Sequence, residues 1–147
     1  TVGFNRRFAP MYIELKRRLQ SRQTPAVINC RMNSPGISGT YWMADPAIGG
    51  AILGEACHFV DLLHWLLDVE PIRASAFTFP TGRPHPIGEN NLTASLQFAD
   101  GSIGNLTYCT VGSKTSGGGR VEVFDSERGR LLDELPEIAT ELASRFL

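Results

Sequence analysis

The stretch IGGAILGEACHFVDLLHWLLDVEP, residues 48–71, decides the fold, because it is a long apolar segment framed by helix boundary signals. It follows a Gly-Gly turn and stops at a proline, so we expect a helix over residues 51–67. Leucines cover most of the circumference of this helix. A helix of this kind is buried on most of its surface, and its few polar side chains must face a cleft, a partner or a satisfied polar network.

The polar side chains of this helix suit acid/base chemistry. Glu55, His58 and Asp61 recur at three-residue spacing, which places them on one side of a regular helix. A neighbouring carboxylate orients an imidazole and keeps its pKa close to the operating pH. Spacing alone leaves three interpretations open: a core histidine tied to a carboxylate, a catalytic histidine, or a metal ligand. We expect no metal, because H-x-x-D lacks the reach of an H-E-x-x-H zinc site.

Composition excludes several classes of protein. The 147 residues suit a single domain over 1–147, and the 14 basic and 15 acidic residues give a formal net charge of -1. This balance predicts no nucleic-acid partner, and no apolar run approaches the roughly 20 residues that span a bilayer. The three cysteines form no C-x-x-C pair, so we expect neither disulfides nor a zinc knuckle, and a cytoplasmic location. The chain begins with Thr, which is typical of a fragment or a remnant of a longer protein.

Around the central helix, the periodicity predicts further helices and strands in an α+β arrangement. Residues 1–8 are predicted to form a short strand and a polar turn, and Pro10 then starts an amphipathic helix that reaches about Arg22. A terminal helix is expected from Pro136. Strands are predicted over residues 26–32, 73–79, 92–98, 102–111 and 120–124. Asp100-Gly101 between the third and fourth of them is a strong hairpin signal, so most of the sheet should be antiparallel.

The glycine triplet at residues 117–119 is not a nucleotide-binding motif. A dinucleotide fingerprint or a P-loop needs its glycines between a strand and a helix, whereas these glycines lead into a predicted strand. The spacing predicts a hairpin turn instead. The chain therefore offers no recognisable nucleotide-binding element of its own.

Three segments in order, VGFNRRFAP, WMADPAIGGAILGEACHFVDLLHWLL and FADGSIGNLTYCTVGSKTSGGGRVEVF, together resemble the C-terminal domain of the Gfo/Idh/MocA (glucose-fructose oxidoreductase / inositol dehydrogenase) family. The likeness runs from residue 2 to residue 133. It implies an α+β domain with an open, mainly antiparallel sheet covered on one face by helices. It also implies an N-terminal Rossmann domain, which is absent from this chain.

The resemblance implies hydride transfer between NAD or NADP and a hydroxyl carbon of a sugar, sugar derivative or polyol. His58 matches the family's acid/base histidine, and we assign Glu55 beside it as the second catalytic residue. Many members carry an aspartate four residues before that histidine, where this chain has Gly54. The residues expected to bind substrate are Asn5, Arg6, Tyr41, Trp42 and Asp61.

The sequence therefore predicts the substrate-binding and catalytic-histidine domain of an NAD(P)-dependent oxidoreductase. The isolated chain is expected to be inactive without a Rossmann domain, and to bind no cofactor alone. The chain is expected to form a homo-oligomer through its sheet face. The alternative is a non-catalytic remnant that acts as a binding or oligomerisation module.

Overall fold

The computed structural model describes residues 2–35, 41–44, 50–78, 90–115, 117–126 and 129–134. Within them the chain forms one six-stranded sheet and a small set of helices. The elements in chain order are η1 (Asn5–Phe8), α1 (Pro10–Leu19), β1 (Val27–Asn33), η2 (Trp42–Ala44), the π-helical turn η4 (Ile52–Ala56), α2 (Cys57–Leu67), β2 (Pro71–Thr78), β3 (Leu92–Phe98), β4 (Ile103–Cys109), β5 (Gly119–Asp125) and β6 (Gly129–Glu134).

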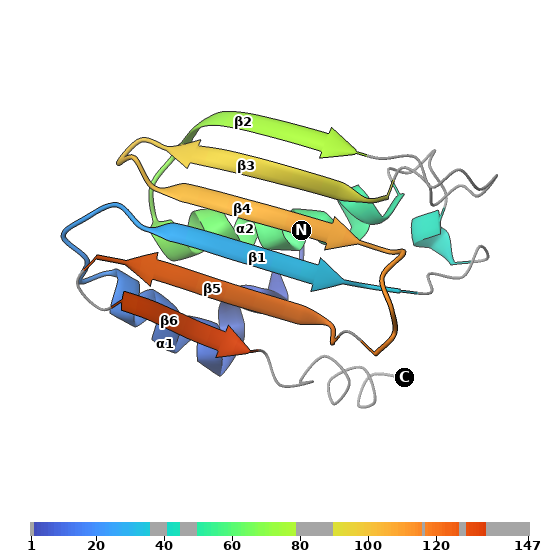
Figure 1. Ribbon diagram of the computed structural model, residues 1–147, viewed down its shortest axis with the longest axis horizontal. Coiled ribbons are helices and arrows are strands. Elements are labelled where there is room, and N and C mark those ends of the chain that lie inside the picture. Colours follow the sequence, from blue (N-terminus) through green and yellow to red (C-terminus); the bar gives the residue numbers. More distant parts are fainter. Residues whose placement is uncertain are drawn as a thin grey trace.

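The sheet is open and mainly antiparallel, as the sequence predicted. Its strand order is β2-β3-β4-β1-β5-β6, and β1 with β4 is the single parallel pair among the described strands (Figure 1). The predicted hairpin joins β3 to β4, with Gly101 at its turn at a φ of 89°. A positive φ of this size favours glycine, because a Cβ there would be strained. The Asp-Gly signal is therefore confirmed.

Helices cover one face of this sheet, and both α1 and α2 lie behind it in Figure 1. The strands alternate accordingly: Gly104, Leu106 and Tyr108 of β4 are buried under the helices, whereas Ile103 and Thr107 point to the opposite face and are exposed. This alternation confirms the α+β layer architecture, and no helix of the described residues covers the opposite face of the sheet, which is called the uncovered face below.

The core lies between α2 and the middle of the sheet. Helix α2 buries five apolar side chains, Phe59, Leu62, Leu63, Leu66 and Leu67. The helix approaches β4 closely, since a Cβ built on Gly104 would lie 3.2 Å from both Leu63 Cδ1 and Phe98 Cε2. Asp68 then ends α2 in the left-handed conformation at a φ of 59°. The buried apolar side chains of α2 thus hold the helix against the sheet, and this packing sets the position of the first residues of α2.

Two predictions near the N-terminus and at the start of the long helix are wrong. Residues 2–4 lie in no strand, and Asn5–Phe8 form a 3₁₀-helix, because its arginines pair with carboxylates of the long helical segment and hold the chain there. The first turn of the helix predicted over 51–67 is a π-helix, Ile52–Ala56. A π-turn contains one residue more than an α-turn and is frequent at functional sites.

The glycine-rich segment before β5 is not a hairpin turn. It links β4 to β5, and these strands are not neighbours, because β1 pairs with both and lies between them. The sequence also missed β6, which pairs antiparallel with β5. The helix expected from Pro136 falls outside the described residues.

Candidate functional site

The candidate site lies where the π-turn Ile52–Ala56 joins α2 and where η1 packs against that junction. His58 stands in the first turn of α2 and is partly exposed. The edge of its ring meets the ring of Phe4, with centroids 5.4 Å apart and an interplanar angle of 88°. Its Nδ1 atom is buried and has no hydrogen-bond partner among the residues that the structure describes. The imidazole therefore retains an unused polar atom.

The surroundings of His58 favour its neutral form. Burial lowers the pKa of its imidazole below the ordinary 6.5, and the positive charge of Arg6 lowers it further. The negative charges of Glu55 and Asp61 act in the opposite direction but are the smaller causes. A neutral imidazole can accept a proton, which a general base has to do.

Glu55 connects the helical segment to the sheet and to η1. Tyr108 Oη donates a hydrogen bond of 2.5 Å to Glu55 Oε2. The other carboxylate oxygen, Oε1, lies 3.8 Å from Arg6 Nη2. The Arg6 guanidinium in turn lies over the Phe59 ring, 3.9 Å from its centroid. Glu55 is therefore held from two directions beside His58.

Asp61 is engaged by the neighbouring arginine of η1. Arg7 donates to both carboxylate oxygens, through Nε to Oδ2 at 2.7 Å and through Nη2 to Oδ1. The Asp61 side chain is only 8% exposed. This fork geometry is the strong form of an arginine–carboxylate pair. It pins η1, and with it Phe4 and Arg6, onto α2.

An aromatic pair borders the π-turn on another side. The rings of Tyr41 and Trp42 lie 5.8 Å apart at 47°, and both side chains are about half exposed. Trp42 and Met43 pack against Gly54, where a Cβ would come within 2.7 Å of Met43 Sδ and 3.0 Å of a Trp42 ring carbon. The η2 turn, which carries Trp42 and Met43, therefore packs directly on Gly54. The position leaves no room for a carboxylate unless those side chains move.

The structure gathers the predicted residues into two groups that share the π-turn. Arg6, Glu55, His58 and Asp61 lie together, and Trp42 with Tyr41 stands against Gly54. Asn5 is exposed, and its backbone N–H donates to Gly3 O. The sequence assigned no role to Tyr108. A signal was present, because the two-residue period of β4 places Tyr108 with Gly104 and Leu106 on the face that packs against the helices.

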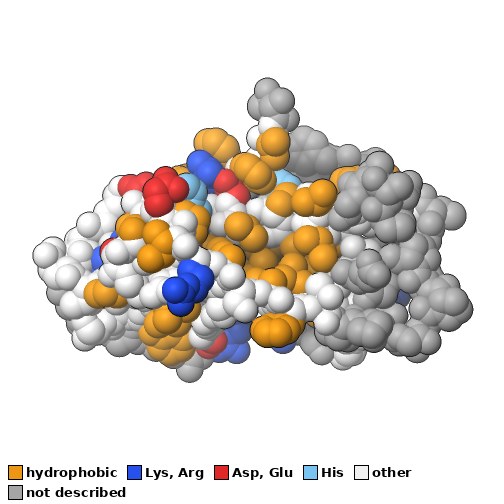
Figure 2. Space-filling model, turned by 90° about the horizontal axis from the view of Figure 1, so that it is seen from above, with side chains coloured by type: hydrophobic (Ala, Val, Ile, Leu, Met, Phe, Trp, Pro, Cys, Tyr) orange, Lys and Arg blue, Asp and Glu red, His pale blue; other side chains and the backbone are white. Residues whose placement is uncertain are grey.

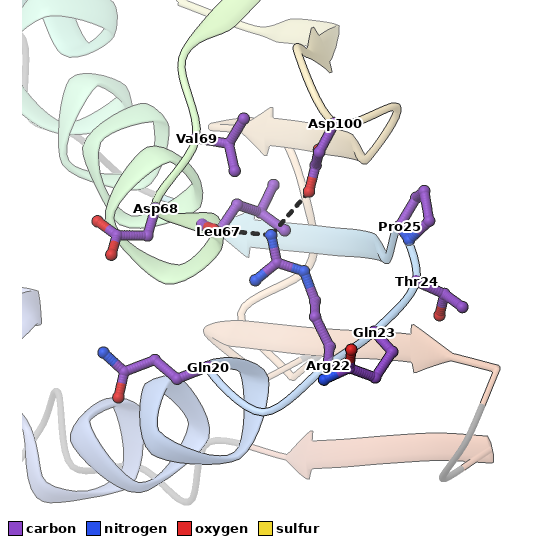
Figure 3. A pocket seen from close by; sticks show the side chains of 9 residues that line it. All are labelled: Gln20, Arg22, Gln23, Thr24, Pro25, Leu67, Asp68, Val69 and Asp100. Atoms are coloured by element: carbon purple, nitrogen blue, oxygen red, sulfur yellow. Dashed lines mark hydrogen bonds and ion pairs between the residues drawn. The ribbon is translucent and has the colours of Figure 1, made fainter.

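Two cavities lie away from His58. One, of about 410 Å³, lies at the opposite end of α2, and Figure 3 shows Arg22 reaching across it to Leu67 and Asp100. Arg22 Nη2 donates to Leu67 O and to Asp100 Oδ2, both at 2.8 Å. These groups satisfy one another and tie the helix end to the β3–β4 turn, which is a structural role.

The second cavity, of about 430 Å³, lies on the uncovered sheet face. A row of hydrogen bonds crosses this face, with Ser95 Oγ donating to Asn105 Oδ1 and Asn105 Nδ2 donating to Asn29 Oδ1. Arg31, Thr107, Arg120 and Glu122 are among its lining residues. Asparagines and a serine in register across three strands make this face polar at its centre.

The described ranges contain neither a metal-ligand cluster nor a membrane-spanning helix. No three His, Cys, Asp or Glu side chains of that part of the chain stand together as a metal site. No helix of that part has the length and apolar character that crossing a bilayer requires. The glycines at 117–118 precede a strand, β5, so they supply no helix N-terminus for a nucleotide pyrophosphate.

Comparison with known proteins gives a consistent result. The family model described as GFO/IDH/MocA C-terminal domain matches residues 13–130. An inositol 2-dehydrogenase/D-chiro-inositol 3-dehydrogenase of Halalkalibacterium halodurans is 30% identical over 88 residues, which is 58% of this chain and 24% of that protein. The chain thus spans about a quarter of this curated relative.

Solved structures share the fold. A probable dehydrogenase from Thermotoga maritima matches with a TM-score of 0.75 and 22% identity, over 92% of this chain and 41% of that one. A myo-inositol dehydrogenase from Lactobacillus casei, in complex with NAD(H) and myo-inositol, matches with a TM-score of 0.70 and 23% identity, over 90% and 38%. The WlbA dehydrogenase from Bordetella pertussis, in complex with NADH and UDP-GlcNAcA, matches with a TM-score of 0.67 and 21% identity, over 84% and 40%.

Proposed function

The chain belongs to the GFO/IDH/MocA C-terminal domain family, and from this membership and the surroundings of His58 we propose that it is the substrate-binding domain of an NAD(P)-dependent oxidoreductase. Its substrate would be a sugar, a sugar derivative or a polyol that is oxidised at a hydroxyl carbon. The observation that carries the proposal is the partly exposed His58 imidazole, whose pKa is lowered by burial and by Arg6, beside the Glu55 and Asp61 carboxylates that Tyr108 and Arg7 hold.

His58 is proposed to act as the general base. In the oxidation, His58 takes the proton of the substrate hydroxyl while the hydride leaves the same carbon, so that a carbonyl forms. The nicotinamide that accepts the hydride is proposed to be bound by the Rossmann domain that the family resemblance implies. In the reverse reaction, the imidazolium returns the proton to the carbonyl oxygen. Glu55 and Asp61 stabilise this imidazolium through their negative charges.

The balance of charge around His58 favours an uncharged substrate. Arg6 faces Glu55, and Arg7 is paired with Asp61, so the four charges sum to zero. A polyol or a neutral sugar would enter without leaving a charge unpaired in the partly buried site. We propose that Tyr41 and Trp42 stack on the apolar face of the ring, and that Asn5 and Arg6 bind its hydroxyls. Asp61 would contact substrate only through an oxygen that it shares with Arg7.

The proposal is tested by binding and by turnover. We expect inositol or a related polyol to shift the NMR signals of His58 and Trp42 in the 147-residue chain, and not those of His64 in the last turn of α2. The chain joined to a nucleotide-binding domain of the family is expected to reduce NAD⁺ or NADP⁺ with the same polyol. A chain that binds no member of a broad sugar and polyol panel, and shows no turnover when joined, would contradict this function.

We further propose that the uncovered sheet face forms a homo-oligomer. The central row Ser95–Asn105–Asn29 offers donors and acceptors in register, and Arg31 and Glu122 beside it offer opposite charges to a second copy. The β2 edge is a second exposed region. Figure 2 looks down on this edge and shows hydrophobic side chains along it. Ile72 and Phe77 of β2 are exposed.

Light scattering tests the assembly. We expect a mass of at least twice that of the chain, and we expect Ile103→Glu, on the uncovered face, to shift it to the monomer. Ile13→Glu is the matched control, since Ile13 is equally apolar and exposed but lies on α1. A monomer at high micromolar concentration excludes the sheet-face oligomer. An oligomer that binds no polyol would instead support the alternative function of a non-catalytic assembly module.

A further inference from the structure

We propose that Tyr108 is a positioning residue of this site, which fixes the Glu55 carboxylate beside His58 and so sets the orientation and basicity of the imidazole. The inference rests on the proposed function, in which His58 exchanges the hydroxyl proton. It concerns a strand residue that lies 53 positions away from Glu55 in the sequence.

Tyr108 is a buried side chain that carries a polar hydroxyl group into the core. Its side chain is fully buried, on the face of β4 that the helices cover. A phenylalanine would fill the same space, so packing alone does not require the phenolic oxygen. That oxygen donates to Glu55 Oε2 at 2.5 Å, and the Ser34 side chain hydrogen-bonds to it as well. The hydroxyl therefore carries a hydrogen bond from the core into the site.

The phenol acts as a constant donor. Burial raises the pKa of Tyr108, and the bonded Glu55 carboxylate raises it further, so the phenol keeps its proton across the range in which enzymes work. A neutral donor that faces a carboxylate stabilises the ionised acid without a competing charge. Tyr108 is thus suited to hold Glu55, and not to exchange protons itself.

The described residues make two contacts with the Glu55 carboxylate, one from Tyr108 and one from Arg6. Gly54, four residues before His58, is covered by Met43 and Trp42 and offers no side chain. The carboxylate stands one residue later, within the π-helical turn Ile52–Ala56. Arg6 Nη2 approaches Glu55 only to 3.8 Å. The short contact to Tyr108 is therefore the main restraint on the carboxylate among the contacts that the structure describes.

The test is a double-mutant cycle with two readouts. Tyr108→Phe removes only the hydroxyl, Glu55→Gln removes the charge, and the double variant removes both. In the chain itself, NMR titration of His58 is expected to give a lower midpoint in both single variants. Glu55→Gln removes a negative charge that raises the pKa of the imidazole, and Tyr108→Phe releases that charge from its position beside the ring. Tyr12→Phe, at the other buried tyrosine of the described chain, is the control and is expected to leave the midpoint unchanged.

In the two-domain enzyme, Tyr108→Phe is expected to lower kcat by about 10- to 100-fold with KM nearly unchanged, as expected for a misplaced catalytic group. In the Glu55→Gln background, the same change is expected to cost less than about twofold, because its target has already been altered. A residue that only stabilises the fold would cost the same in both backgrounds. Equal losses, or a His58 midpoint that Tyr108→Phe does not move, would overturn the inference.

The outcomes separate this inference from the proposed function. If His58→Ala keeps its turnover, the proposed function fails, and with it the catalytic meaning of Tyr108. If His58→Ala is inactive and Tyr108→Phe matches the parent in both readouts, the positioning role alone fails. If Tyr108→Phe does not fold, Glu55→Gln still tests the inference, because a His58 midpoint that Glu55→Gln does not move would overturn it.

Discussion

Replacing His58 by alanine in the two-domain enzyme is expected to lower kcat by about 10²–10⁴-fold, the usual contribution of a general acid or base. The loss should appear in kcat and in kcat/KM equally, because the imidazole acts on a proton that moves only in the transition state. The rate of nicotinamide reduction at saturating substrate is the measurement. A turnover within threefold of the parent would rule out His58 as the base.

The matched control is His64→Ala, on the same helix. His64 is partly exposed, and its Nε2 lies 3.6 Å from Glu70 Oε1, at the end of α2 away from the site. We expect its turnover to remain within about twofold of the parent, since surface changes of this kind have small effects.

The pH profile of the parent follows from the lowered pKa of His58. The base is active when neutral, and its pKa in the folded chain lies below the ordinary 6.5. The kcat/KM of oxidation is therefore expected to be constant on the neutral side of pH 6.5 and to fall only on its acidic side. Removing the Arg6 charge with Arg6→Gln should move this fall toward higher pH, because Arg6 is one of the causes of the lowering.

The second large effect concerns stability. Leu63→Ala is expected to lower the free energy of unfolding by about 3 kcal/mol, because Leu63 is fully buried where α2 meets β4 and its removal leaves a cavity. Urea unfolding followed by circular dichroism measures the loss, with an unchanged slope expected. The control Val60→Ala, at an exposed position of α2, should cost less than about 1 kcal/mol.

A compensating change at Gly104 identifies the contact. Gly104→Ala alone is expected to destabilise the chain, since its methyl group would lie 3.2 Å from Leu63 Cδ1. In the Leu63→Ala background, the same methyl group enters the vacated space and should cost less or become favourable. Additive losses would show that the helix and the sheet do not meet at this point in solution.

Local patterns were enough to predict most elements of the fold. Alternation along residues 26–32 and 92–98 predicted β1 and β3 with bounds correct to about one residue, and Asp100-Gly101 predicted β4 as the hairpin partner of β3. The position of β1 between β4 and β5 was beyond reach, because parallel pairing joins segments with no turn between them. The glycines before β5 were predicted to form a hairpin turn because no local signal shows that β1 lies between β4 and β5.

The site was predictable only within single segments. The spacing of Glu55 and His58 in one helix predicted that they would lie close together. The contacts that hold them come from elsewhere: Asp61 pairs with Arg7, which is 54 positions earlier in the chain, and Glu55 pairs with Tyr108 on a strand. No local sequence pattern predicts a π-turn in place of an α-turn. The segment Ile52–Ala56, which is apolar except for Glu55, is compatible with either. Packing of distant segments decides such details.

The glycine beneath Trp42 and Met43 has a consequence for how such domains diverge. An aspartate at position 54, expected from the family resemblance, would place its Cβ within 3.0 Å of both neighbouring side chains. A change to aspartate at this position therefore requires the Met43 and Trp42 side chains to shift, and a smaller residue 43 would make it easier. The order of mutations matters, and lineages with glycine or with aspartate at this turn should differ together at the position of Met43, as an epistatic pair.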